Sequence, residues 1–220
     1  MQNDAMPYLL NSLSIIRKNF SPLFLLIAAS TIFYIPMIQK SSNILYFFLG
    51  FASMFFFYPS IYGQYTEITL YNRQIRYAVL FKRHWLNFVI VSLLLGLPII
   101  ILSLFSSILE IDLDSLKLIY SILVSSLSIY VLPLLFIHGK RWESIKVGFQ
   151  CVAGNFSFNL PLIIIVSVTT TLAFNFRQIE NGTNNTYSLT VYGVITILSL
   201  IVEFWLFVSA ILILKDKGLA

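Results

Sequence analysis

The chain is short of charge and almost without cysteine. Only 10% of its 220 residues are Asp, Glu, Lys or Arg, whereas soluble domains contain about 25%. Because Cys151 is the single cysteine, an internal disulfide is excluded and the redox compartment stays open. No polar stretch is long enough to form a second folded unit, so we expect one domain over residues 1–220.

The sequence also lacks the short motifs of common catalytic centres. Neither G-x-S-x-G, H-E-x-x-H nor the phosphate loop G-x-x-x-x-G-K occurs. The two histidines, His84 and His138, have no carboxylate partner to complete a metal site. Glu110, Asp112 and Asp114 lack the glycine and the final glutamate of a calcium-binding loop. We therefore expect no enzymatic activity, no metal and no cofactor.

The net charge of +5 is large enough for nucleic-acid binding, but the placement of the charges along the chain does not suit it. The basic residues occur in short groups between apolar runs and form no continuous stripe. Binding to a phosphate backbone needs such a stripe, because it neutralises several neighbouring phosphates at once. We therefore expect no nucleic-acid partner.

Apolar residues are what the sequence has in abundance: they make up 58% of the chain, and the mean hydropathy is +0.87. A soluble fold of this size could not bury so much apolar surface. A helix needs about 20 residues to cross the hydrocarbon core of a bilayer. We predict an all-α polytopic membrane protein with six transmembrane helices, over Ser21–Ile38, Ile44–Tyr62, Phe88–Leu109, Leu116–Ile137, Phe158–Phe176 and Val191–Leu214.

The basic residues between these runs predict the orientation in the membrane. Cytoplasmic loops carry an excess of Lys and Arg. Three of the 14 Lys and Arg residues, Lys40, Lys117 and Arg177, would lie on one side. The others would all lie on the opposite side: Arg17, Lys18, Arg73, Arg76, Lys82, Arg83, Lys140, Arg141, Lys146, Lys215 and Lys217. We therefore place both termini in the cytoplasm.

Short amphipathic segments precede the first, third and fifth spans. Each carries apolar residues at helical spacing beside Lys or Arg, which is typical of a helix lying in the headgroup plane. The apolar residues are Leu9, Leu13, Ile16 and Phe20 before span one, Tyr71, Ile75 and Ala78 before span three, and Trp142, Ile145, Phe149 and Val152 before span five. The pattern is compatible with a three-fold repeat of surface helix plus hairpin over residues 1–66, 67–139 and 140–217, or with generic membrane chemistry.

Three segments carry a resemblance to a known family. They are a surface helix with an Asn-Phe junction at Arg17–Ile27, the segment Arg73–Leu95, and the basic helix that opens Glu143–Ile165. In these the chain resembles the YciC-type family of uncharacterised bacterial inner-membrane proteins. It is also similar to the membrane domain of some glycerophosphodiester phosphodiesterases, whose catalytic domain the sequence does not contain. The resemblance implies an all-helical bacterial inner-membrane protein with six spans and without assigned catalysis.

Glu203 is the candidate functional residue inside the membrane. It is the only acidic residue well within a predicted span, and an ionised carboxylate there is costly unless it is paired. It is either a proton- or cation-coupling site or a neutral acid whose hydrogen bonds hold helices together. The hydrogen-bond partners that we expect are Ser125, Ser128, Tyr130 and Thr170.

A second candidate site is a basic rim on the cytoplasmic side. Such a rim is expected to contact the phosphates of membrane phospholipid. It comprises Arg73, Arg76, Lys82, Arg83, His84, His138, Lys140, Arg141 and Lys146.

These features favour a non-catalytic multi-pass protein of the cell envelope that contacts lipid or binds a partner protein. The alternative is a transporter or permease subunit, such as the membrane half of an ABC-type exporter. In that case Arg73–Arg83 or Lys140–Val152 would dock on an ATPase subunit. A membrane enzyme acting on lipid is disfavoured, because clustered acid–base residues are lacking. A homo-oligomer is also compatible with so small a bundle.

Overall fold

A computed structural model describes residues 5–38, 44–109, 113–182 and 186–220 of the chain. Over these ranges the chain forms helices joined by short turns and contains no β-strand, which confirms the all-α class. The helices are α1 (Met6–Lys18), α2 (Phe20–Ile38), α3 (Ile44–Tyr71), α4 (Tyr77–Leu109), α5 (Asp114–Leu127), α6 (Val131–His138), α7 (Arg141–Ala153), α8 (Phe156–Gly182) and α9 (Thr186–Asp216).

Between three and five of the described helical segments are able to cross a membrane. Tyr77–Ile108, Phe156–Asn175 and Gly193–Asp216 are each long and apolar enough alone. Two bent pairs of helices, α1 with α2 and α5 with α6, also qualify if each pair is taken as one span. The membrane class is therefore supported. The predicted span Ile44–Tyr62 lies mostly outside the residues whose side chains the structure describes, so the count of six stays a prediction.

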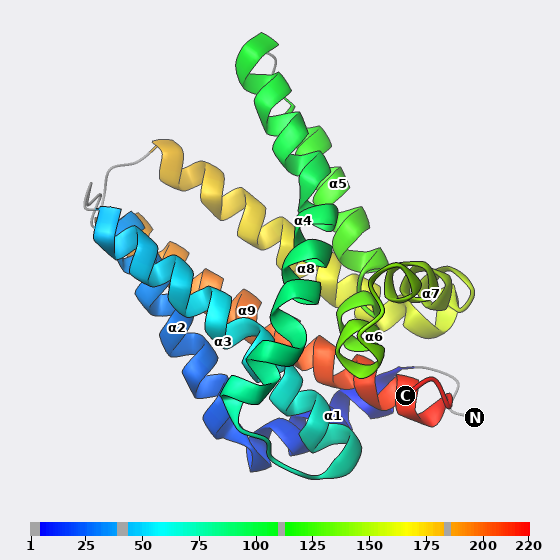
Figure 1. The fold of residues 1–220 in the computed structure, drawn as a ribbon. Coiled ribbons are helices and arrows are strands. Elements are labelled where there is room, and N and C mark those ends of the chain that lie inside the picture. The colour runs from blue at the N-terminus through cyan, green and yellow to red at the C-terminus, as the bar shows by residue number, and fades with distance from the viewer. Residues whose placement is uncertain (1–4, 39–43, 110–112, 183–185) are drawn as a thin grey trace.

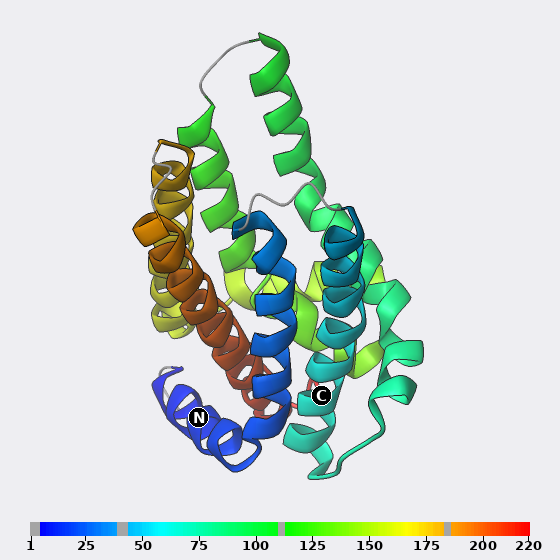
Figure 2. The same cartoon turned by 90° about the vertical axis from the view of Figure 1, so that its left-hand side faces the viewer.

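The helices form a bundle in which α2 lies beside α3 and α8 lies beside α9. Both chain ends and the turn between α3 and α4 lie at the same end of this bundle (Figures 1 and 2). The packed core is largest near that end, where α9 contacts α1, α2, α3 and α6. Buried rings and aliphatic side chains of α3 and α9, including Tyr65 and Phe204, occupy its centre.

Helix α1 lies across the end of the bundle, bent by 85° from α2. Leu9 and Ile16 face inward onto α9, whereas Leu13 of the same predicted stripe is exposed. The indole Nε1 of Trp205 donates to the carbonyl of Leu9 at 2.8 Å. The hydroxyls of Ser12 and Ser209 are 2.7 Å apart and share a hydrogen bond. These polar contacts fix where α1 sits on α9.

The prediction of a surface helix before span three is wrong. Tyr71 instead ends α3, residues 73–76 are not helical, and Ala78 lies in the first turn of α4. The end of α3 is stabilised by Lys215, whose Nζ donates to the last carbonyls of α3, those of Thr69 (3.3 Å) and Leu70 (3.2 Å). The repeat boundary drawn after residue 66 therefore falls inside α3.

Only part of the apolar stripe predicted on α7 faces the rest of the bundle. Ile145 and Phe149 pack against a cluster formed by Val131 and Leu135 of α6, but Trp142 is 72% exposed. The reason is that α7 presents its smallest residue to α6: a Cβ at Gly148 would lie 2.7 Å from Cγ2 of Val131. This close approach sets the rotation of α7 about its own axis, and Trp142 is turned outward.

The predicted fourth span, Leu116–Ile137, is broken into α5 and α6, which are bent by 43°. The break covers residues 128–130. Pro133 has no N–H, so the carbonyl of Ile129 cannot receive the usual helical hydrogen bond four residues on. The chain instead closes a tighter turn, in which the amide of Val131 donates to the carbonyl of Ser128 at 2.9 Å.

Candidate functional site

A cavity of about 400 Å³ that is partly open lies between α2, α3, α8, α9 and the broken helix α5–α6. Its apolar wall includes Leu132, Val166 and Leu200. Its polar wall is unusually rich in hydroxyl groups for a site among apolar helices. The polar residues are Ser30, Tyr58, Tyr62, Ser121, Ser125, Ser128, Thr169, Thr170, Ser199 and Glu203.

Glu203 lies deep within the bundle, yet its side chain is accessible. The two facts agree because the carboxylate faces the cavity instead of packing against a neighbouring helix. The phenol of Tyr62, which is itself buried, donates a hydrogen bond of 3.1 Å to Oε1 of Glu203. The site thus holds a carboxylate that is oriented by one donor and remains open to a small molecule.

The structure places three of the four expected partners of Glu203 around the same cavity: Ser125, Ser128 and Thr170. Tyr130 lies elsewhere, since its phenol donates to Oδ1 of Asn159 at 2.5 Å. The donor that Glu203 uses is Tyr62, which sequence reasoning did not find. Every span offers hydroxyl groups, and only the packing of α3 against α9 decides which one reaches the acid.

A cluster of aromatic rings begins at the cavity wall, where Tyr62 and Phe207 line it. The ring centroid of Tyr62 lies 4.5 Å from that of Phe207 and 5.9 Å from that of Phe136. His84 continues the cluster, 4.8 Å from Phe136. Edge-to-face and stacked rings pack densely. The cluster extends from the cavity wall to α4 through His84 and to α6 through Phe136.

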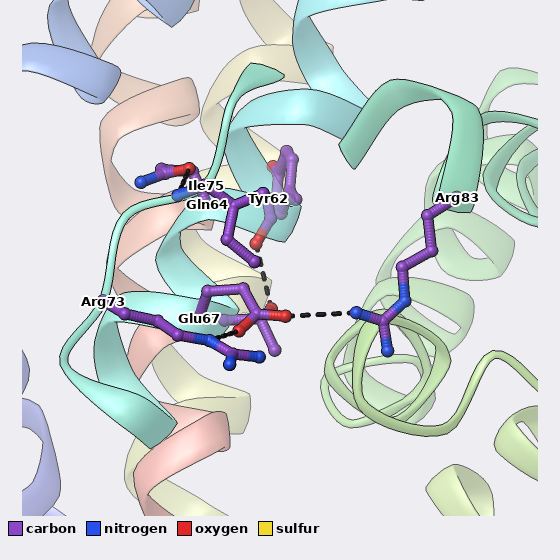
Figure 3. A network of polar contacts seen from close by, with 7 residues as sticks. Tyr62, Gln64, Glu67, Arg73, Ile75 and Arg83 are labelled. Atoms are coloured by element: carbon purple, nitrogen blue, oxygen red, sulfur yellow. Dashed lines mark hydrogen bonds and ion pairs between the residues drawn. The ribbon is translucent and has the colours of Figure 1, made fainter. Parts of the chain in front are cut away.

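Beyond the rings lies a second carboxylate, Glu67, which is only 4% exposed. Its Oε2 accepts from Nε of Arg73 at 2.7 Å, and its Oε1 accepts from Nη1 of Arg83 at 3.2 Å. Figure 3 shows Glu67 between the two guanidinium groups, with Gln64 holding the amide of Ile75 nearby (3.2 Å). The carboxylate raises the pKa of the Arg73 guanidinium by hydrogen bonding. The network ties the α3–α4 turn to both helices.

Sequence reasoning missed Glu67 because the predicted second span ended at Tyr62. The signal that could have found it is an acid in the mostly uncharged segment Thr66–Leu70, about one and a half helical turns beyond the end of that span. A helix continuing to Tyr71 puts this acid against the bundle, where it needs basic partners.

The members of the predicted basic rim have different surroundings. Arg76, Lys82 and Lys146 are exposed, whereas the other members have protein partners. Arg73 and Arg83 bind Glu67. Nε of Arg141 donates to Oδ1 of Asn87 at 2.7 Å, and Lys140 pairs with Glu143 at 2.8 Å. Nε2 of His138 lies 2.9 Å from the carbonyl oxygen of Leu219. His84 is not at the rim, because it is buried against Phe136.

Among the described residues, no group of three or more His, Cys, Asp or Glu side chains is placed to hold a metal ion. No family model, no curated protein and no solved structure matches the chain. The resemblance to the YciC-type family therefore stays a prediction. The fold is all-helical over the described residues, and three to five of its helical segments are long and apolar enough to cross a membrane.

Proposed function

We propose that this protein is a six-span membrane transporter or permease subunit that binds a small molecule in the cavity around Glu203. The observation that carries the proposal is the accessible carboxylate of Glu203 inside the bundle. A purely structural acid would be enclosed by its partners, since unpaired charge in the bilayer is costly. Here only one hydrogen bond, from Tyr62, reaches the carboxylate from the described side chains.

The broken helix α5–α6 supports the same function. Ser128 and Ile129 of the break, together with Pro133, line the cavity. Transporters place their substrates beside interrupted helices, because the interruption frees backbone groups for binding and lets one half of the helix move. The aromatic cluster around Tyr62 would act as the closed gate on the cytoplasmic side, and the cavity would open toward the outside.

The orientation belongs to this proposal. Both termini would lie in the cytoplasm, α1 would lie in the headgroup layer, and the membrane would be the bacterial inner membrane that the family resemblance implies. Lys217→Cys and Asn184→Cys, each introduced separately in a Cys151→Ala background, test this. A membrane-impermeant maleimide added to intact cells should label residue 184 and leave residue 217 unlabelled until the cells are opened. Equal labelling of both would contradict the orientation.

Transport itself is tested in proteoliposomes containing the purified protein. Uptake of labelled small molecules should depend on the protein and should fall at least about tenfold in Glu203→Gln, because one hydrogen-bonded charge contributes that much or more to binding. Glu143→Gln is the matched control, since Glu143 is an exposed acid on α7 paired with Lys140. Uptake that is equal in wild type and Glu203→Gln would contradict the proposal.

A second candidate is a non-catalytic, lipid-contacting or partner-binding subunit of the envelope. The exposed cations Arg76, Lys82 and Lys146 favour it, because exposed basic residues near a membrane attract anionic headgroups. Mass spectrometry of the detergent-purified protein would then find anionic phospholipid, or a partner such as an ATPase. Replacing these three residues with Gln should release the lipid under this candidate and leave cavity-dependent uptake unchanged under the first.

A further inference from the structure

The wall of the cavity has charge of one sign only. Among the described residues that line it, Glu203 is the single acid, and there is no Lys, Arg or His. A bound anion would therefore meet a carboxylate without a compensating cation. A bound cation would supply the counter-charge that Glu203 lacks within the bilayer. The charge inventory alone favours a cationic ligand.

The hydroxyl groups point to the same ligand chemistry. Ser30 donates to the carbonyl of Leu26 at 2.9 Å, and Ser121 donates to that of Lys117 at 2.8 Å. Thr169 likewise donates to a carbonyl of its own helix. A hydroxyl has one proton and two lone pairs, so each of these groups keeps acceptor capacity for its other neighbours; at Ser30 the hydroxyl of Tyr58, 3.3 Å away, uses part of it. These acceptors, together with the carboxylate of Glu203, favour a ligand that donates hydrogen bonds.

The volume of the cavity and its aromatic rings narrow the class of ligand further. Sites for small organic molecules measure about 300–1,000 Å³, and this cavity measures about 400 Å³. A bare metal ion would leave most of that space empty, and one carboxylate is too few ligands to hold it. The rings of Tyr58, Tyr62, Phe174 and Phe207 line the wall. Aromatic rings attract organic cations and also bury apolar groups.

We infer that the cavity binds an amphipathic organic ammonium ion. Its N–H groups donate to Glu203 and to the neighbouring hydroxyls, and its apolar body lies against residues such as Leu132, Val166 and Leu200. This inference names the substrate class of the transport function proposed above and rests on it. Tyr62 orients the carboxylate through its hydrogen bond and keeps one oxygen directed to α3.

Three probes of equal size but different charge test the inference. They are 4-phenylbutylammonium, the neutral 4-phenylbutanol and the anionic 4-phenylbutanoate. Binding to the purified protein in nanodiscs is measured by calorimetry at neutral pH, and protein-free nanodiscs correct for partition into lipid. We expect the ammonium ion to bind at least about tenfold more tightly than the alcohol, since tenfold corresponds to one modest charge interaction. The anionic probe, 4-phenylbutanoate, should bind most weakly.

Glu203→Gln should remove the preference for the ammonium ion and leave the affinity for the alcohol unchanged. Glu143→Gln, the exposed-acid control, should keep the preference. Ser125→Phe should weaken binding of the ammonium ion and of the alcohol, because the ring fills the cavity. Gel filtration of each variant confirms that it is folded. Equal binding of the three probes, or an ammonium preference that survives in Glu203→Gln, would overturn the inference.

The two proposals fail in different ways. If the ammonium ion binds through Glu203 but is not taken up by proteoliposomes, the binding site stands and transport is wrong. If a neutral or anionic compound is taken up in a manner that Ser125→Phe blocks, transport stands and the ligand class is wrong. Binding that Ser125→Phe leaves unchanged lies outside the cavity and would overturn the inference.

Discussion

The phenol of Tyr62 and the carboxylate of Glu203 are joined by a 3.1 Å hydrogen bond that connects α3 to α9. Tyr62 is buried among aromatic rings, whereas Glu203 faces the cavity. The bond therefore stands at the boundary between the aromatic cluster and the open site. A ligand that binds Glu203 is held next to the cluster that would have to move during transport.

Tyr62→Phe removes this hydrogen bond while keeping the ring in its aromatic cluster. We expect a loss of about 1.5–3 kcal/mol in the free energy of unfolding, since one hydrogen bond to a charged acceptor contributes about that much. Unfolding of the detergent-solubilised protein by heat measures the change. Tyr71→Phe is the control, because the Tyr71 side chain is exposed. Equal stability of Tyr62→Phe and wild type would show that the bond contributes nothing.

Replacement of both Arg73 and Arg83 by Gln should destabilise the protein more than replacement of Glu67 by Gln. The arginine side chains are 57% and 55% exposed and can be hydrated when their partner is lost, but the Glu67 side chain is 6% exposed and cannot. Losing both partners leaves a buried carboxylate unpaired. Melting temperatures of the two variants compare these costs. The opposite order would contradict the interpretation of Glu67 as the buried centre of the network.

Gly148→Ala should loosen the packing of α7 on α6. The added Cβ would lie 2.7 Å from Cγ2 of Val131 and 3.0 Å from its backbone N and Cα, so the helices must move apart. We expect a cost of about 1–3 kcal/mol, as for other overpacked sites. Gly96→Ala is the matched control, since nothing lies within 4 Å of the added Cβ. Gly96→Ala should leave the stability of the protein unchanged or raise it, because alanine favours helices.

Alkylation of Cys151 should be slow in the folded protein and should accelerate with pH. Burial raises the pKa of the Cys151 thiol above its ordinary value of 9.0, so at any given pH less of the reactive thiolate is present than in the unfolded chain. The rate of reaction with iodoacetamide, followed by mass spectrometry, should still be rising above pH 9. Unfolding in detergent at fixed pH should increase the rate. A fast reaction at neutral pH in the folded protein would contradict this.

Hydropathy was sufficient to predict the all-α class and the approximate positions of the helices, because a chain in hydrocarbon must satisfy its backbone hydrogen bonds internally. It failed where local sequence competes with packing. The surface helix around Ile75 is absent because α3 continues to Tyr71 and is capped by Lys215 from the far end of the chain. The proline alone did not predict the break before Pro133, because Pro59, Pro98 and Pro161 lie inside continuous helices.

The sequence by itself determined that Glu203 needs a partner, because a carboxylate among apolar residues is costly wherever the helices lie. It did not determine the partner, the cavity or the pairing of Glu67 with Arg73 and Arg83. Those depend on which helices are neighbours and how each is rotated, and contacts such as Gly148 against Val131 set that rotation. Residues far apart in the sequence, such as Tyr62 and Glu203, become one site only when α3 packs on α9.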